Sequence, residues 1–243
     1  GGKSTLLAGL LPEGSLLLSN EPMPKRAHVL AENMQKWTRM PVGAYPVESI
    51  VTNNYPADFG AFSDCFDLIV TDVPCSGEGM FRKEPQALTE WSMDNVRLCA
   101  ARQKEILNNA ANAVKPGGRL VYSTCTFAPE ENEGVVADFL SRHPDFSLVP
   151  IEVSWGRSAF DAQSILLFCP DIDTAIDLSG CRRIFPQHGG EGHFIALFRR
   201  DGVSERNVKT TSNSHTDSNA KAALELYREC FSDEPNGEFL TIG

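Results

Sequence analysis

Short apolar runs alternate with amphipathic stretches along this chain, and that alternation is typical of an α/β protein with a mostly parallel sheet. Apolar segments predict strands at residues 15–20, 47–52, 66–72 and 119–124, and later at 182–185 and 193–199. Helical periodicity predicts helices at residues 3–11, 24–39, 94–114 and 130–141. In the second helix one face collects Ala27, Leu30, Ala31 and Met34, and the turn at residues 115–118 stops the third.

The chain changes character near residue 200. Residues 201–220 are polar and rich in Ser, Thr and Asn, which predicts a linker, and residues 221–243 could begin a further domain. Residues 1–200 then form one α/β domain. The sequence opens on Gly1 within what reads as a motif, so we expect a fragment that lacks the first strand of its sheet.

Composition narrows the class of protein. No apolar run among the 243 residues approaches the length that spans a bilayer, so we expect a cytoplasmic protein without a membrane partner. The net charge of −10 means that an RNA partner would need a local basic strip or flanking domains. The seven cysteines include no C-x-x-C pair and no zinc spacing, so we expect no metal and a reducing compartment.

The opening GGKST segment has two interpretations. It matches the end of a phosphate-binding Walker A loop, and it equally fits a glycine turn that lets the backbone approach a nucleotide. Glu21 favours the second interpretation, because it follows a predicted strand at the spacing where doubly wound folds place the acid that accepts ribose hydroxyls. Gly1, Gly2, Lys3 and Glu21 are therefore cofactor-site candidates, although Glu21 could also be an ordinary surface residue.

Two cysteine motifs each follow a predicted strand. DVPCSGEGMFRK spans residues 72–83, and YSTCT spans residues 122–126. Because α/β sheets carry their active sites at the carboxyl ends of strands, we expect Asp72, Cys75 and Cys125 on one edge. Arg82 and Lys83 offer two positive charges for a phosphate. The glutamates at positions 130, 131 and 133 suit a helix amino terminus and are expected to stabilise that helix.

Two cysteines beside an aspartate indicate covalent chemistry on an electrophilic ring. A thiolate is a strong nucleophile, and carbon 5 of cytosine cannot accept a methyl group unaided. Addition of a thiolate at carbon 6 moves electron density to carbon 5, which can then attack a sulfonium methyl group. The alternative is a structural turn with incidental buried cysteines.

The two cysteine motifs resemble those of the Nop/Sun family of RNA 5-methylcytosine methyltransferases. DVPCSGEGMFRK and KPGGRLVYSTCTFAPEENE look like its active-site motifs, and GGKST looks like the end of its first motif. The first cysteine motif and residues 183–200 are most similar to bacterial ribosomal RNA members. The resemblance covers residues 1–200. It implies a Rossmann-like fold, S-adenosylmethionine as cofactor and RNA of the small ribosomal subunit as substrate.

The resemblance also implies roles for individual residues. Cys125 would be the nucleophile, Cys75 would assist product release, and Asp72 would hold the cytosine and border the cofactor. Cys75 is the alternative nucleophile, because DNA cytosine methyltransferases use the cysteine of a Pro-Cys motif. Family members commonly carry an acidic residue near the adenine, and Tyr55 occupies that position here. Asn54, directly before it, is the cofactor candidate in this segment. Two other functions stay open at this point, a P-loop NTPase and a catalytically silent RNA-binding scaffold.

Overall fold

The computed structural model describes residues 1–12, 14–38 and 47–203, and these fall into two compact units. One unit contains the described residues up to Ala61, and the other contains those from Phe62 onwards. The predicted linker and further domain lie outside the described residues, apart from the first three linker positions. Their assignment stays a prediction.

The first unit is a pair of parallel strands with two helices. Strands β1 and β2 run in register from Leu16 opposite Glu48 to Asn20 opposite Thr52. Both helices contact the strands and each other around a small core of Ala8, Leu30 and Met34. The bounds in chain order are α1 Gly2–Leu10, β1 Leu16–Asn20, α2 Pro24–Thr38, β2 Glu48–Thr52 and the 3₁₀ turn η1 Pro56–Ala61.

The four predicted elements of this unit are confirmed within a residue or two. Position 39, the predicted end of the second helix, lies outside the described residues. On α2, three of the four predicted core residues, Ala27, Leu30 and Met34, are buried, as a 3.6-residue period requires. The fourth, Ala31, is only partly covered.

The second unit is built on a six-stranded sheet. Its strand order is β3–β4–β8–β7–β6, with β5 beside β8. Only β3 and β4 are parallel to one another here, and the later strands pair in antiparallel fashion. The bounds are β3 Phe66–Asp72, β4 Val114–Thr124, β5 Phe146–Leu148, β6 Arg157–Ser158, β7 Arg182–Ile184 and β8 His193–Arg200.

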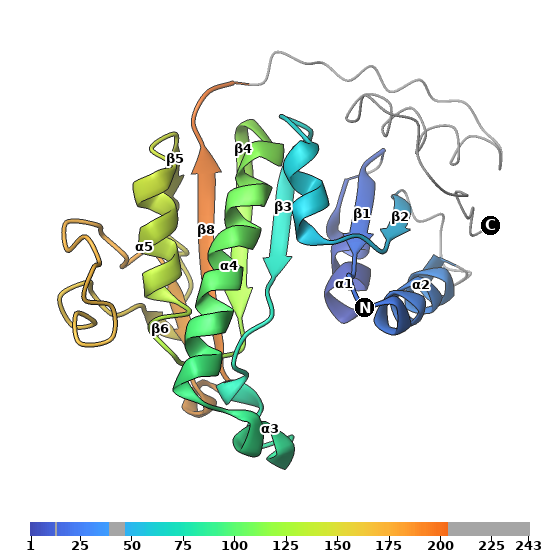
Figure 1. The fold of residues 1–243 in the computed structure, drawn as a ribbon. Coiled ribbons are helices and arrows are strands. Elements are labelled where there is room, and N and C mark those ends of the chain that lie inside the picture. The colour runs from blue at the N-terminus through green and yellow to red at the C-terminus, as the bar shows by residue number, and fades with distance from the viewer. Residues whose placement is uncertain (13, 39–46, 204–243) are drawn as a thin grey trace. The chain divides into compact units, whose positions relative to one another are not determined.

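Two helices of this unit, α4 (Met93–Ala113) and α5 (Glu133–Arg142), pack side by side over the sheet (Figure 1). Ser92 caps α4 by accepting a hydrogen bond from the Asn95 N–H, which satisfies an otherwise unpaired helix-end donor. Their apolar faces cover a core that is rich in aromatic and β-branched residues. Shorter helical pieces are η2 Glu78–Met80, α3 Pro85–Glu90 and η3 Pro186–His188.

The structure corrects two predicted boundaries. The segment 115–118 does not separate α4 from a later strand, because β4 already begins at Val114, which pairs with Phe66. The extra residues are absorbed as an irregularity before Arg119 pairs with Leu68, and Gly117 takes a positive φ of 79° there. The helix predicted from residue 130 begins at Glu133, so residues 130–132 form a turn before it. The sequence does not predict the short elements β5, β6 and α3, because they are too brief to show a hydrophobic period.

Candidate active site

The two motif cysteines meet at one edge of the sheet. Strands β3 and β4 are parallel neighbours, with Asp72 opposite Ser123, and in Figure 1 both arrowheads point to the end where α3 lies. The loops that follow therefore leave together, and the Sγ atoms of Cys75 and Cys125 lie 3.2 Å apart. The Cys125 N–H also donates to the Cys75 sulfur at 3.4 Å. The predicted placement of both cysteines on one edge is what the structure shows.

Asp72 is the last residue of β3 and is exposed at the same edge. Its carboxylate accepts a hydrogen bond of 3.3 Å from the Ser123 hydroxyl on the neighbouring strand. The end of β3 therefore places the Asp72 carboxylate at the edge from which the two cysteine loops leave, as the sequence predicts.

Three further hydrogen bonds join the loop that carries Cys75 to the loop that carries Cys125. The Ser76 and Thr126 hydroxyls lie 2.9 Å apart, the Phe127 N–H donates to the Glu78 carboxylate at 2.9 Å, and the Gly79 N–H donates to the Cys125 carbonyl at 2.8 Å. Gly79 must be glycine, because a Cβ there would lie 2.7 Å from that carbonyl oxygen and 2.8 Å from the Gly192 oxygen. The two loops thus form one connected unit.

Two glutamates that the sequence placed in a helix amino terminus are fully buried instead. Glu131 and Glu133 have no exposed surface. Glu131 precedes α5 and accepts hydrogen bonds from the backbone of the Cys75 loop, while Glu133 forms an ion pair with the buried Arg183. Glu133 lies in the first turn of α5, as predicted, but the sequence carries no local sign of these distant partners.

The protonation of the cysteine pair follows from its geometry. The hydrogen bond with the Cys125 sulfur, and then burial, raise the pKa of the Cys75 thiol far above its ordinary value of 9.0. Cys75 therefore keeps its proton at neutral pH. Burial likewise raises the pKa of the Glu131 carboxyl, although hydrogen bonds from Ser76 and Gln103 oppose that shift.

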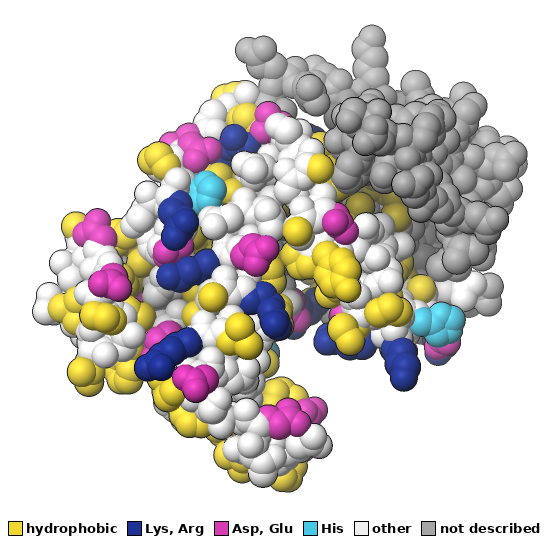
Figure 2. Space-filling view, in the orientation of Figure 1, with side chains coloured by type: hydrophobic (Ala, Val, Ile, Leu, Met, Phe, Trp, Pro, Cys, Tyr) yellow, Lys and Arg dark blue, Asp and Glu magenta, His cyan; other side chains and the backbone are white. Residues whose placement is uncertain are grey.

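Arg82 and Lys83, predicted to contact phosphate, are exposed, but both face one carboxylate. Glu191 lies 3.9 Å from the Arg82 guanidinium and 3.6 Å from the Lys83 ammonium. Sequence reasoning missed Glu191, which lies more than a hundred residues further along the chain. On the face shown in Figure 2, cationic and anionic side chains are interspersed. Lys104 on α4 also forms an ion pair with Asp138 on α5.

The remaining cofactor candidates belong to the first unit. Glu21 and Asn54 follow the parallel strands β1 and β2, and the two loops are tied together because the Asn54 N–H donates to the Asn20 side chain at 2.9 Å. The Glu21 carboxylate accepts the Met23 N–H and pairs with Arg26. A carboxylate has about four acceptor positions, so Glu21 retains capacity for ribose hydroxyls.

Gly1 and Gly2 stand at the amino terminus of α1, with Lys3 in its first turn. A Cβ at Gly1 would lie 2.8 Å from the Asn33 side chain, so this position is narrow, whereas Gly2 is open.

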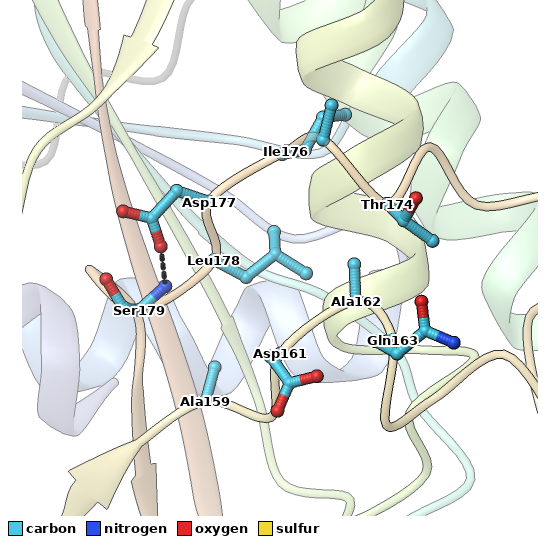
Figure 3. Close-up of a pocket in the computed structure, with 10 residues that line it drawn as sticks. Ala159, Asp161, Ala162, Gln163, Thr174, Ile176, Asp177, Leu178 and Ser179 are labelled. Atoms are coloured by element: carbon cyan, nitrogen blue, oxygen red, sulfur yellow. Dashed lines mark hydrogen bonds between the residues drawn. The ribbon is translucent and has the colours of Figure 1, made fainter.

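A separate pocket of the second unit contains none of the predicted site residues. Its volume is about 380 Å³, and it is lined by Ala159 and by residues 161–163 and 174–179. Its carboxylates hold local turns: Figure 3 shows Asp177 accepting the Ser179 N–H, and Asp161 accepts from the backbone and hydroxyl of Ser164. The pocket therefore offers no carboxylate that lacks a partner.

Across residues 1–12, 14–38 and 47–203, no group of three or more His, Cys, Asp or Glu side chains could hold a metal ion. Within the same ranges, no helix is long and apolar enough to pass through a membrane.

Solved structures define the class to which this fold belongs. NSun6 from Pyrococcus horikoshii, solved with SFG, is similar over 84% of this chain and 46% of its own, with a TM-score of 0.64 and 24% identity. A methyltransferase homolog from Pyrococcus horikoshii is similar over 81% of this chain and 65% of its own, with a TM-score of 0.57 and 25% identity. The chain has a Rossmann-like methyltransferase fold, as the sequence predicts.

Sequence comparison identifies a family within this class of methyltransferase folds. Residues 1–199 match the family model of the 16S rRNA methyltransferase RsmB/F proteins, and the chain belongs to that family. Ribosomal RNA small subunit methyltransferase F of Cronobacter sakazakii is 36% identical over 207 residues, which cover 84% of this chain and 39% of that protein. Its counterpart in Aeromonas salmonicida is 33% identical over 201 residues, covering 82% and 38%.

This membership confirms the resemblance carried by the two cysteine motifs, and it favours S-adenosylmethionine over the nucleotide of a P-loop protein. The chain spans less than half the length of the curated relatives it matches.

Proposed function

We propose that this protein methylates carbon 5 of a cytidine in RNA, and that the RNA is 16S ribosomal RNA. The observation that carries the proposal is the pair of sulfur atoms 3.2 Å apart at the carboxyl edge of two parallel strands. Asp72 lies at the same edge. The relatives named as ribosomal RNA small subunit methyltransferases support the choice of substrate.

In this proposal Cys125 forms a covalent bond to carbon 6 of the base. Its thiolate adds there, and the electron pair moves to carbon 5. S-adenosylmethionine would supply the methyl group. Carbon 5 then loses its proton to a base, the bond between sulfur and carbon 6 breaks, and the thiolate is regenerated. Asp72 would hold the ring near nitrogen 3, and the base must be unstacked to reach this edge.

The contact between the two sulfur atoms supports a shared role in this chemistry. A nucleophilic cysteine must be a thiolate, and a thiol at 3.2 Å can donate a hydrogen bond to that sulfur. The hydrogen bond with the Cys125 sulfur, and then burial, raise the pKa of Cys75, which fits Cys75 as the partner that donates.

We assign the cofactor to Gly1, Gly2, Lys3, Glu21 and Asn54, together with Asp72, and phosphate contacts to Arg82 and Lys83. The acidic residue after β1 supports the ribose contact, since it is the position that doubly wound folds use for this purpose. The exposure of Arg82 and Lys83 is compatible with phosphate binding.

The test is bisulfite sequencing of 16S ribosomal RNA from cells that lack the gene and from cells complemented with variants of the intact protein. Wild type and Cys65→Ala should restore one methylated cytidine, because Cys65 is a half-buried cysteine outside the pair. Cys125→Ala should not restore it. Cys75→Ala should accumulate a protein–RNA adduct that survives denaturing detergent, and the adduct should disappear when Cys125→Ala is added.

Each other outcome contradicts part of the proposal. An adduct that requires Cys75 instead would reverse the two roles. If no cytidine depends on the gene, the protein is not a cytosine-5 methyltransferase of this RNA, and a silent RNA-binding scaffold becomes the better interpretation.

A further inference from the structure

Two adjacent residues in the turn before α5 contact different cysteine loops. Glu131 and Asn132 have no exposed surface, and neither is among the residues to which the proposed function assigns a role. The Glu131 side chain contacts the residue that follows Cys75, and the Asn132 side chain contacts the residues that flank Cys125.

Glu131 and Gln103 hold the loop on both sides of Cys75. The Ser76 N–H donates to the Glu131 carboxylate at 3.0 and 3.3 Å. The Gln103 amide donates to the Pro74 carbonyl at 2.9 Å and to the same carboxylate at 2.7 Å. Gln103 is itself fully buried, and its oxygen accepts the Tyr122 hydroxyl at 3.0 Å. The peptide groups before and after Cys75 are therefore both fixed by side chains.

Asn132 holds the segment around Cys125 in the same way. The Thr124 hydroxyl donates to the Asn132 oxygen at 2.7 Å, and the Asn132 amide donates to the Thr126 carbonyl at 3.0 Å. Both threonines are buried. One asparagine side chain thus bridges the residues on either side of Cys125.

We propose that Glu131, acting through Gln103, is a positioning residue for Cys75 and that Asn132 is a positioning residue for Cys125. This inference rests on the proposed covalent function. Because Glu131 contacts the Cys75 loop and Asn132 contacts the segment around Cys125, the two residues serve different steps of the reaction. Loss of Asn132 impairs formation of the bond between sulfur and carbon 6, and loss of Glu131 impairs its release.

Substitutions of equal size test the two residues because each reverses one hydrogen-bond partner. In Glu131→Gln the new amide group turns a donor toward the Ser76 N–H or the Gln103 amide, where two donors oppose each other. In Asn132→Asp a carboxylate oxygen replaces the amide that donates to the Thr126 carbonyl, where two acceptors oppose each other. A buried polar group left without its partner shifts or destabilises its surroundings.

The experiment uses the intact protein with 16S ribosomal RNA transcript and S-adenosylmethionine, and measures adduct and methylated product separately. Glu131→Gln should raise the ratio of adduct to product about tenfold, or about 1.4 kcal/mol. In a Cys75→Ala background, Asn132→Asp should slow adduct formation about tenfold, whereas Glu131→Gln should change it by no more than about twofold.

A purely structural role is tested by Leu107→Ala, which removes a fully buried core side chain one helical turn beyond Gln103. This variant should lower the thermal midpoint and leave the ratio of adduct to product unchanged. Each variant's melting curve gives the folded fraction, and rates are compared per folded molecule.

The inference is overturned if Cys75→Ala accumulates adduct but Glu131→Gln changes adduct and product in proportion, as Leu107→Ala does. It is also overturned if Glu131→Gln and Asn132→Asp impair the same step. If Cys75→Ala accumulates no adduct while the wild type methylates, the covalent function has failed instead.

Discussion

The buried pair of Arg183 and Glu133 gives the sharpest prediction for stability. Arg183, at the centre of β7, pairs through two nitrogens with both Glu133 carboxylate oxygens at the start of α5. A third nitrogen donates to the Phe127 carbonyl at 2.9 Å, in the loop after Cys125. Both side chains are at most 2% exposed. The perturbation is Arg183→Met, which keeps much of the volume and removes the charge.

The expected loss of stability in Arg183→Met follows from the contacts that Glu133 keeps. Without Arg183, Glu133 is a buried carboxylate that still accepts the Phe160 N–H at 3.0 Å. Removing one partner of a buried ion pair costs about 3–5 kcal/mol, against a net stability of about 5–15 kcal/mol for a domain. For a domain of this size, the thermal midpoint should fall by about 6–20 °C.

The double variant Arg183→Met with Glu133→Leu separates charge from packing. Replacing both charges by apolar groups removes the uncompensated carboxylate, so about 1–3 kcal/mol of the loss should be recovered. The Phe127 carbonyl and Phe160 N–H still lose partners, at about 1 kcal/mol each. The control is Arg97→Met in the exposed pair with Asp94, which should change stability by less than about 1 kcal/mol.

The measurement is denaturant unfolding and thermal melting of the intact protein. If Arg183→Met costs no more than Arg97→Met, the pair is not the buried element described above. The same conclusion follows if the double variant is less stable than Arg183→Met.

Three other predictions follow from the site. Gly79→Ala should abolish methyl transfer and lower the thermal midpoint, because the added Cβ meets two backbone oxygens. The control Gly9→Ala, within α1, should be neutral or stabilising by up to about 1 kcal/mol. If Gly79→Ala is as active as the wild type, the close approach at Gly79 is refuted. In Cys125→Ala the largest cause of the raised Cys75 pKa is lost, so alkylation of Cys75, followed by mass spectrometry, should begin at lower pH than in wild type, and an unchanged pH profile would refute the coupling. The double variant Arg82→Ala and Lys83→Ala should reduce the salt dependence of RNA binding by about one to two units of log–log slope, while Arg97→Ala should not change it, and an unchanged slope in the double variant would remove both residues from the RNA contact.

The sequence predicts this site where the information is local. A strand that ends at Asp72 and another that ends at Thr124 can be read from apolar runs, and the rule for parallel sheets then brings Cys75 and Cys125 together. The sulfur separation of 3.2 Å bears this out. The same local reading succeeds for the helices α2 and α4, whose periodicity is long enough to be distinctive.

Local reading fails where a side chain's partner is distant in sequence. Glu131 bonds to Gln103, 28 residues earlier, and to Ser76, 55 residues earlier. A run of glutamates before a helical pattern ordinarily indicates a helix amino terminus exposed to solvent. Nothing in that run distinguishes an exposed carboxylate from one whose burial is compensated by donors from other elements.

Glu131, in the turn before α5, also explains how loops that contain glycine can hold the thiols of Cys75 and Cys125 in contact. The Cys75 loop contains Gly77 and Gly79, and glycine increases the conformational entropy that must be lost when a loop is ordered. Hydrogen bonds to charged groups in a buried setting are among the stronger ones, at about 1.5–3 kcal/mol each. Glu131 accepts from both the loop backbone and Gln103, so one carboxylate offsets a substantial part of that entropy. An apolar residue at position 131 would pack in the same place but leave the Ser76 N–H without its acceptor. The backbone of the Cys75 loop therefore requires a hydrogen-bond acceptor at position 131, and Glu131 provides it together with an acceptor for Gln103.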